Sequence, residues 1–166
     1  MFNLLDSNPK IEAFSPSSKV WLFTSNKMLD EPEQLSIQID IDAFCAHWDS
    51  HGVVLKATGF ILFSRLLMLV VDESFHSISG CSMDKSVAFL KNMEIKYKIS
   101  LFDRLLQSAL VDNQWQTNAT AVWSEKLKSN EINLDTVFID TLVNNLYDAQ
   151  SSLTKKLGDF WLKRVI

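Results

Sequence analysis

Residues 53–73 read VVLKATGFILFSRLLMLVVDE and consist of two β-branched and apolar runs that join near Ser64-Arg65. Two such runs with a short joint between them predict a β-hairpin. The second run is apolar at each position from Leu66 to Val71, so both faces of its strand should be covered by other parts of the protein. We therefore expect this strand to lie in the centre of a sheet.

A strand and a helix are predicted before the hairpin. Residues 20–24, VWLFT, form a short apolar run that suits a buried strand. Residues 30–33 place acids and a proline where a helix would begin. Over residues 37–48 the apolar positions fit the alternation of a strand as well as the spacing of a helix. The capping signal favours the helix, with His51-Gly52 as its glycine stop.

A polar loop over residues 74–80 is predicted to follow the hairpin and to lead into a second helix. Ser82 is the expected N-cap of this helix. Asp84 would then lie in the first turn, where the helix dipole favours an anion. The apolar spacing continues the helix to about Lys98.

The last third of the chain leaves one alternative open. Residues 105–111 and 116–123 flank Asp112-Asn113 and predict another hairpin, although the first of these segments also fits a helix. Apolar residues from Phe138 to Leu146 predict a C-terminal helix. Phe160-Trp161 is expected to anchor the tail.

The order strand, helix, hairpin, helix, hairpin predicts an α+β protein whose helices cover one face of a mainly antiparallel sheet. The nearest named layout is a ferredoxin-like βαββαβ core with an extra hairpin and a C-terminal helix. The 166 residues contain no internal repeat and no Pro- or Gly-rich linker. We expect a single domain over residues 1–166, with residues 1–18 as a polar lead-in and residues 19–166 as one compact α+β unit.

Composition excludes several classes of function. Sixteen basic and twenty acidic residues give a net charge of −4, which argues against a nucleic-acid partner. The longest apolar run is far shorter than the roughly 20 residues of a membrane helix, so no membrane insertion is expected. The first residues do not resemble a secretory signal, and the expected localisation is cytoplasmic. The two cysteines and three histidines have no metal-ligand spacing, so we predict no metal and no cofactor.

Residues 67–73, LMLVVDE, match the Walker B pattern of an apolar strand followed by Asp-Glu. A phosphate-binding loop also needs glycines followed by a lysine, and none of the four glycines precedes a lysine. A P-loop ATPase is therefore not expected. The plain interpretation is a buried strand that reaches solvent at its acidic end.

Residues 80–84, GCSMD, form the most suggestive segment for chemistry. A cysteine at a helix start can be a nucleophile, because free backbone amides and the helix dipole stabilise its thiolate. The same amides can instead hold a phosphate or carboxylate, with Ser82 donating its hydroxyl. In the structural alternative, Gly80 turns the chain, Ser82 caps the helix and Cys81 packs as a small apolar residue.

Other polar residues could complete such a site if the fold brings them together. His51 could act as a base for Cys81, with Asp72 or Asp84 orienting its ring. Lys56 is either an anion contact or a solvated residue on the outer face of its strand. The candidates for catalysis are Cys81, His51 and Asp72, and those for ligand binding are Gly52, Lys56, Gly80, Cys81, Ser82 and Asp84.

Several segments, taken in order, resemble a family of short bacterial proteins that carry the label "ABC transporter ATPase". These segments are KVWLFTSNK (19–27), AHWDSHGVVLKA (46–57), VDES (71–74), GCSMDKSVAFLKNME (80–94), LFDR (101–104) and TLVNNL (141–146). The resemblance covers about residues 19–164 and supports the helix over residues 37–48. The label implies ATP hydrolysis linked to a transporter, but this chain has neither a Walker A loop nor an LSGGQ-like signature. The role that follows is an accessory protein without ATPase activity of its own.

Two functions from different classes are thus expected. The first is a non-enzymatic α+β module that binds a partner protein or a small anionic ligand at residues 80–84. This function is compatible with a monomer or with a homo-oligomer. The second is a thiol-dependent enzyme with Cys81 as nucleophile and His51 as base.

Overall fold

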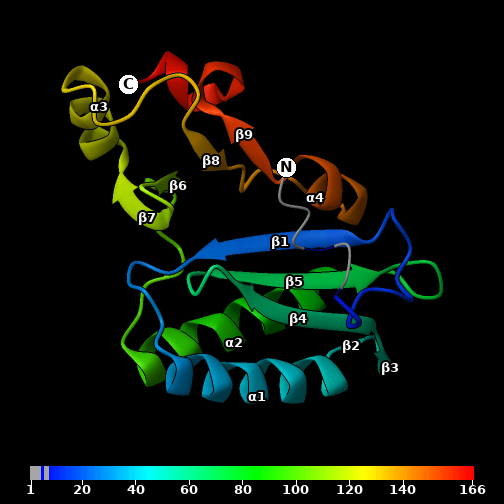
Figure 1. Cartoon of the computed structure of the whole chain (residues 1–166). Coiled ribbons are helices and arrows are strands. Elements are labelled where there is room, and N and C mark those ends of the chain that lie inside the picture. The colour runs from blue at the N-terminus through cyan, green and yellow to red at the C-terminus, as the bar shows by residue number, and fades with distance from the viewer. Residues whose placement is uncertain (1–4, 6–7) are drawn as a thin grey trace.

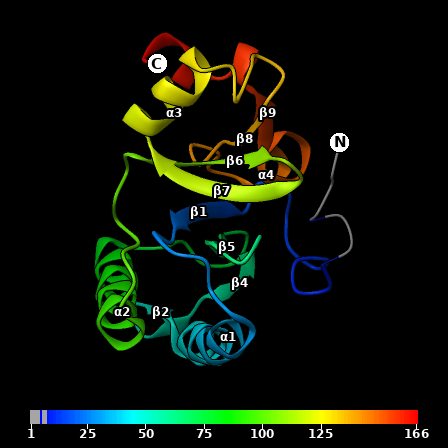
Figure 2. The ribbon, with the colours of Figure 1, turned by 60° about the vertical axis from the view of Figure 1, so that its left-hand side comes forward.

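A computed structural model describes residue 5 and residues 8–166 of the chain. The first sheet has the antiparallel order β1-β5-β4, and helices α1 and α2 cover one of its faces (Figures 1 and 2). The elements of this layer are β1 (Lys19–Thr24), α1 (Glu31–His47), β4 (Lys56–Leu62), β5 (Leu66–Asp72) and α2 (Gly80–Tyr97). A second layer, built from the chain after α2, lies on the opposite side of this sheet (Figure 2).

The predicted hairpin and its central strand are confirmed. β5 pairs with β4 from Leu62↔Leu66 to Lys56↔Asp72 and with β1 along its other edge. All seven residues of β5 are buried, as expected for a strand covered on both faces. Phe63 and Ser64 both have φ near +55°, which gives the turn the twist that a tight hairpin requires.

The predicted helix before the hairpin is also confirmed, but its end is not where we expected it. α1 begins with a capping box, in which the Asp30 side chain accepts from the Glu33 amide and the Glu33 side chain accepts from the Asp30 amide. The helix ends at His47 instead of continuing to Gly52. His51 and Gly52 form the positive-φ turn between two short strands, β2 (Asp49–Ser50) and β3 (Val53–Val54). The glycine serves a hairpin turn rather than a helix stop.

The second helix begins three residues earlier than predicted. Ser79 is the N-cap of α2, and its hydroxyl accepts from the Ser82 amide. Ser82 lies at the third helical position and completes a capping box made of two serines. The predicted N-cap was therefore wrong, because serine can occupy either end of this motif. Asp84 consequently lies beyond the first turn, whereas the predicted end near Lys98 is confirmed.

The second sheet has the antiparallel order β7-β6-β8-β9. Its strands are β6 (Leu106–Val111), β7 (Gln114–Ala119), β8 (Val137–Ile139) and β9 (Thr154–Lys156). The hairpin alternative for this region is confirmed, with Asp112 and Asn113 at positive φ in its turn. α3 (Thr120–Lys128) follows β7, and the chain ends in two 3-10 turns, η1 (Leu157–Asp159) and η2 (Trp161–Arg164).

The predicted C-terminal helix from Phe138 to Leu146 is wrong. Phe138 and Ile139 belong to β8, which is paired on both sides, and the helix α4 (Leu146–Ser152) only begins at the end of the predicted span. A short apolar run that is buried on both faces cannot be assigned to strand or helix from its spacing. At the tail, Phe160 is buried, whereas Trp161 is 37% exposed.

The described residues thus form an α+β protein with four α-helices and three small antiparallel sheets. The ferredoxin-like topology is not confirmed. Its fourth strand should pair with the outer edge of β1, but after α2 the chain enters the second sheet. Within the described residues that edge of β1 is bridged only at Lys19↔Asn145.

Hydrophobic clusters cover both faces of the first sheet. One cluster joins the inner faces of α1 and α2 to β5, and it includes Trp48, Ile41 and Leu90. The other joins the sheet to α4 and includes Leu5 and Ile11 from the expected lead-in. A third cluster fills the second sheet around Trp123. In the part of the chain that the structure describes, each helix falls short of the length and apolar character that crossing a bilayer requires.

Candidate functional site

The start of α2 uses most of its polar groups for the fold. Ser82 is fully buried, and its hydroxyl contacts Ser79 Oγ at 2.7 Å and donates to the Asp49 carbonyl at 2.9 Å. Gly80, Cys81 and Asp84 are exposed. A buried hydroxyl that already has two partners cannot also bind an exposed ligand. Ser82 therefore serves the fold as the third residue of the capping box, while Ser79 is the N-cap, and Cys81 is an exposed thiol rather than a packed one.

The β2–β3 hairpin is fastened to this helix start. Trp48 Nε1 donates to the Ser82 carbonyl at 2.8 Å, and Lys85 forms an ion pair with Asp49. These contacts bring the turn that contains His51 and Gly52 to the same end of the molecule as Cys81. The two candidate groups remain exposed, and no hydrogen bond joins His51 to Cys81 in the described structure. The structure thus places a base and a thiol in one region without assembling them into a dyad.

Asp72 and Lys56 form a separate cluster at the open end of the β4–β5 hairpin. The Asp72 carboxylate accepts from Lys56 Nζ at 2.9 Å, from the Ser15 amide at 3.1 Å, and from the Ser74 amide and hydroxyl at 3.0 and 2.5 Å. Lys56 Nζ also donates to the Ala13 carbonyl. Lys56 is therefore not a free anion contact, since its ammonium is already shared between two acceptors, although its side chain is 34% exposed.

The same contacts control the charge of Asp72. The side chain is only 3% exposed, and burial alone would raise its pKa. Hydrogen bonds from Ser74, Lys56 and Ser15 outweigh burial and hold the pKa of this carboxyl well below its usual range. A carboxylate that is fully bonded and so weakly basic serves the fold rather than orienting His51.

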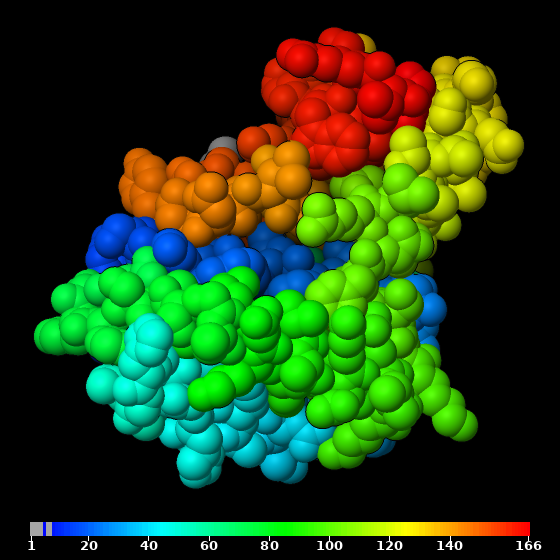
Figure 3. Space-filling model, turned by 180° about the vertical axis from the view of Figure 1, so that it is seen from behind, coloured from blue at the N-terminus to red at the C-terminus, as the bar shows by residue number. Residues whose placement is uncertain are grey.

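A cleft of about 820 Å³ runs along β1 between the two layers, and the sequence did not reveal it. Figure 3 shows this face of the molecule hollowed over β1, drawn in blue between green α2 and the orange segment around residue 142. One wall comes from α2, through Met83, Ser86 and Val87, and the other comes from residues 141–145 and Trp161. Its volume lies in the range of known ligand sites.

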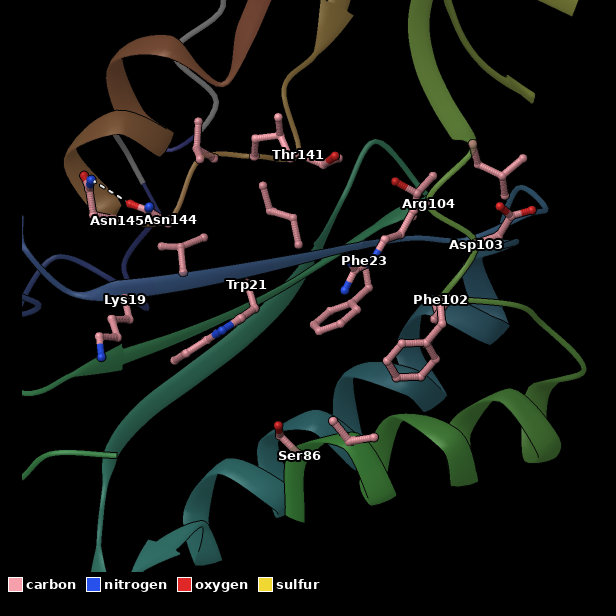
Figure 4. Close-up of a pocket in the computed structure, with 18 of the residues that line it drawn as sticks. Lys19, Trp21, Phe23, Ser86, Phe102, Asp103, Arg104, Thr141, Asn144 and Asn145 are labelled. Carbon is pink, nitrogen blue, oxygen red and sulfur yellow. Dashed lines mark hydrogen bonds between the residues drawn. The ribbon is translucent and has the colours of Figure 1, made fainter. Parts of the chain in front are cut away.

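The cleft has apolar walls and polar ends. Trp21 and Phe23 project from β1 toward α2, and Phe102 lies beside Phe23 (Figure 4). Asp103 and Arg104 lie at this end of the cleft, and Lys19 lies at the other (Figure 4). Apolar walls with a few polar groups are typical of sites that bind by burying apolar surface and that fix orientation by hydrogen bonds.

One polar group in the wall of the cleft has no partner. Gln107 is 3% exposed, and its Nε2 donates to the Arg104 carbonyl at 3.2 Å. This contact fixes the orientation of the amide, because the carbonyl requires a donor. Gln107 Oε1 is left buried without a hydrogen-bond partner among the described residues. A buried acceptor in this state costs about 1–3 kcal/mol.

The sequence carried one signal of this feature. Gln107 and Ser108 are polar residues inside the otherwise apolar strand LLQSALV. Ser108 Oγ contacts Thr117 Oγ1 at 2.7 Å, whereas Gln107 Oε1 has no such partner. Only the tertiary structure distinguishes the satisfied polar residue from the unsatisfied one.

Comparison of the chain with protein-family models, with curated proteins and with solved structures gives no match. The resemblance to the transporter-labelled family therefore stays a prediction. Among residue 5 and residues 8–166, no three His, Cys, Asp or Glu side chains are grouped so that they could hold a metal ion.

Proposed function

We propose that this protein is a non-enzymatic binding module that holds a segment of a partner protein in the cleft between β1–α2 and residues 141–145. The observation that carries the proposal is the cleft itself, whose walls are mainly apolar side chains along β1. A polypeptide segment offers apolar side chains for such walls and backbone N–H and C=O groups for polar contacts at nearly every residue.

The chemistry of the lining favours a polypeptide over a small anion. Two cations line the cleft, but Lys19 is already paired with Glu73 at 2.9 Å. Arg104 is accompanied by Asp103, so the ends of the cleft carry little net positive charge. Between them the walls are formed mainly by apolar side chains, which gain free energy by excluding water from another apolar surface.

The cleft also lies where the expected ferredoxin-like core would have its fourth strand, beside the outer edge of β1. α2 extends along this place and would cover an added element from one side (Figure 4). A partner segment seated there would bury apolar surface of Val87 and Leu142, which a free cleft leaves in contact with water.

A pair of substitutions on α2 tests this function. Val87→Trp fills the cleft, and Ala88→Trp adds the same side chain at the next, exposed position, which does not line the cleft. A photo-crosslinking amino acid at Leu142, on the rim of the cleft, should join the partner in cells of the native host. The crosslinked product should disappear with Val87→Trp and persist with Ala88→Trp.

A control position is available at Leu134, which is exposed but does not line the cleft. A crosslinker there should give no such product. The same product from Leu134, or an undiminished product with Val87→Trp in a folded variant, would show that the partner does not occupy the cleft.

A further inference from the structure

The outer edge of β1 has backbone groups that the fold leaves open. The Ser25 amide donates to the Arg65 carbonyl at 2.7 Å. Ser25 and Arg65 are therefore a hydrogen-bonded pair that continues the register of β1 and β5 by one residue. Hydrogen-bonded and non-hydrogen-bonded pairs alternate along antiparallel strands. The backbone groups of Val20, Leu22 and Thr24 therefore point away from β5.

The first part of this outer edge is occupied by the chain itself. The Val20 amide donates to the Asn144 carbonyl at 3.0 Å, and the Leu146 amide donates to the Ser18 carbonyl at 2.9 Å. The bridge Lys19↔Asn145 makes this short segment antiparallel to β1. Beyond it, no described residue forms a hydrogen bond with the outward amide and carbonyl of Leu22 or with the amide of Thr24.

The open part of the edge lies inside the cleft. Val20, Leu22 and Thr24 all line it, with α2 on one side and residues 141–145 on the other (Figure 4). Open strand edges are usually blocked by charges, prolines or covering elements. Here the edge is flanked by apolar walls and retains its donors and acceptors, which are the features of a site for strand addition.

We propose that the partner segment is an extended peptide that adds to β1 as an antiparallel strand, an inference that rests on the proposed function of the cleft. Its backbone pairs with Leu22 and Thr24 and continues the line of residues 144–146, which already pair with the start of β1. From Leu22 to Thr24 the open edge spans about 7 Å, so about three extended residues of the peptide lie opposite it.

The walls and ends of the cleft specify the peptide further. Alternate side chains of an added strand point to opposite faces, so one set meets α2 around Val87 and the other meets Leu142. Both sets are therefore apolar. Arg104 lies at the Phe23 end of β1, where an antiparallel peptide begins (Figure 4).

The test uses a random nine-residue peptide library displayed on phage and selected on the full chain. A selected peptide is synthesised with single N-methyl groups, each of which removes one backbone donor. N-methylation at the alternate residues that face β1 should weaken binding by about tenfold per site, the loss of one hydrogen bond. N-methylation at the intervening residues should change the Kd by less than about threefold, measured by fluorescence polarisation.

Two variants of β1 test the edge from the other side. Leu22→Pro removes an outward amide and leaves the β1–β5 ladder intact, and Leu22→Val shortens the side chain but keeps the amide. Leu22→Pro should weaken the peptide at least about tenfold relative to Leu22→Val. If Leu22→Pro does not fold, the N-methylated peptides alone decide.

The outcomes separate the two proposals. Val87→Trp could abolish binding while peptides N-methylated at either set of alternate residues bind equally well. The peptide would then occupy the cleft without strand pairing, which overturns strand addition but leaves the proposed function standing. If no peptide is enriched, or if Val87→Trp binds like Ala88→Trp, both proposals fail. If analytical ultracentrifugation shows a dimer that Leu22→Pro dissociates and Leu22→Val does not, the edge serves a second copy of the chain, and the partner peptide is overturned.

Discussion

Lys56 and Asp72 lie directly opposite each other at the open end of the β4–β5 hairpin, and their ammonium and carboxylate groups are 2.9 Å apart. The same two side chains hold the N-terminal segment through the Ala13 carbonyl and the Ser15 amide. This cluster fastens residues 13–15 to the sheet, next to the buried side chain of Ile11. A pair that sequence analysis placed among the candidate site residues thus joins the N-terminal segment to the first sheet.

Asp72→Asn should lower the free energy of unfolding by about 2–3 kcal/mol. The substitution leaves the ammonium of Lys56 without its carboxylate and replaces an acceptor of the Ser15 or Ser74 amide by a donor. Urea unfolding measures the effect. The matched control is Asp135→Asn, because Asp135 pairs with Lys156 on the exposed surface, where a loss below about 1 kcal/mol is expected. Equal losses in the two variants would contradict the structural role of Asp72.

The contribution of Asp72 should also depend on pH. In the folded state burial would raise the pKa of this carboxyl, but hydrogen bonds from Ser74, Lys56 and Ser15 lower it below the unfolded value of about 3.9. A lowered folded pKa stabilises the protein fully above the unfolded pKa, and this contribution is lost as pH falls from there toward the folded pKa.

The difference in unfolding free energy between wild type and Asp72→Asn should therefore be constant from about pH 5 to 7 and shrink below about pH 4. Urea titrations at several pH values measure it. A difference that stays constant down to about pH 3 would show that the folded and unfolded pKa values of Asp72 are similar.

Gly59→Ala should destabilise the protein by about 2–3 kcal/mol. A Cβ at this position of β4 would lie 2.7 Å from Ile41 Cγ2 and 2.9 Å from the Met68 carbonyl oxygen, and backbone cannot move away cheaply. Gly80→Ala is the control, since a Cβ there meets nothing within 4 Å at the start of α2. That substitution should stabilise by about 0.5 kcal/mol, because alanine restricts the unfolded chain. Thermal unfolding of both variants checks the opposite signs.

The two cysteines should react at very different rates. Burial, together with the nearby charge of Asp42, raises the pKa of the Cys45 thiol to about 12, whereas Cys81 is exposed. Because the thiolate is the reacting species, iodoacetamide should modify one thiol per native chain and two after unfolding in urea. Native Cys81→Ser should take up none. Rapid modification of two thiols in the native protein would contradict the burial of Cys45.

Local patterns were sufficient where a segment's own residues fix its structure. The apolar run from Leu66 to Val71 identified a central strand because a strand covered on both faces has no polar positions. The acids and proline around Asp30 identified a helix start because the cap is made by residues three apart. The turn at Asp112-Asn113 was found for the same reason, since these residue types tolerate positive φ.

Predictions failed where the deciding partner lies elsewhere in the chain. Phe138 and Ile139 form a strand because β6 and β9 pair with it on either side, and neither neighbour is visible in their own spacing. The polar candidates changed role for the same reason. Ser82 is bound by Asp49 and Ser79, and the carboxylate of Asp72 is shared among groups from three parts of the chain.

The sequence by itself determined the hairpin, the two long helices and the α+β class, because backbone hydrogen bonding and local burial impose periods of about two and 3.6 residues that can be read along the chain. Only the tertiary structure decided that β1 keeps an open edge, that a cleft runs beside it and that Gln107 Oε1 faces no donor. These are properties of what lies next to a residue in space. The residues of a free strand edge or of an unpaired acceptor can be identical to those of a paired one. Whether they are paired depends on which distant segments of the chain pack beside them.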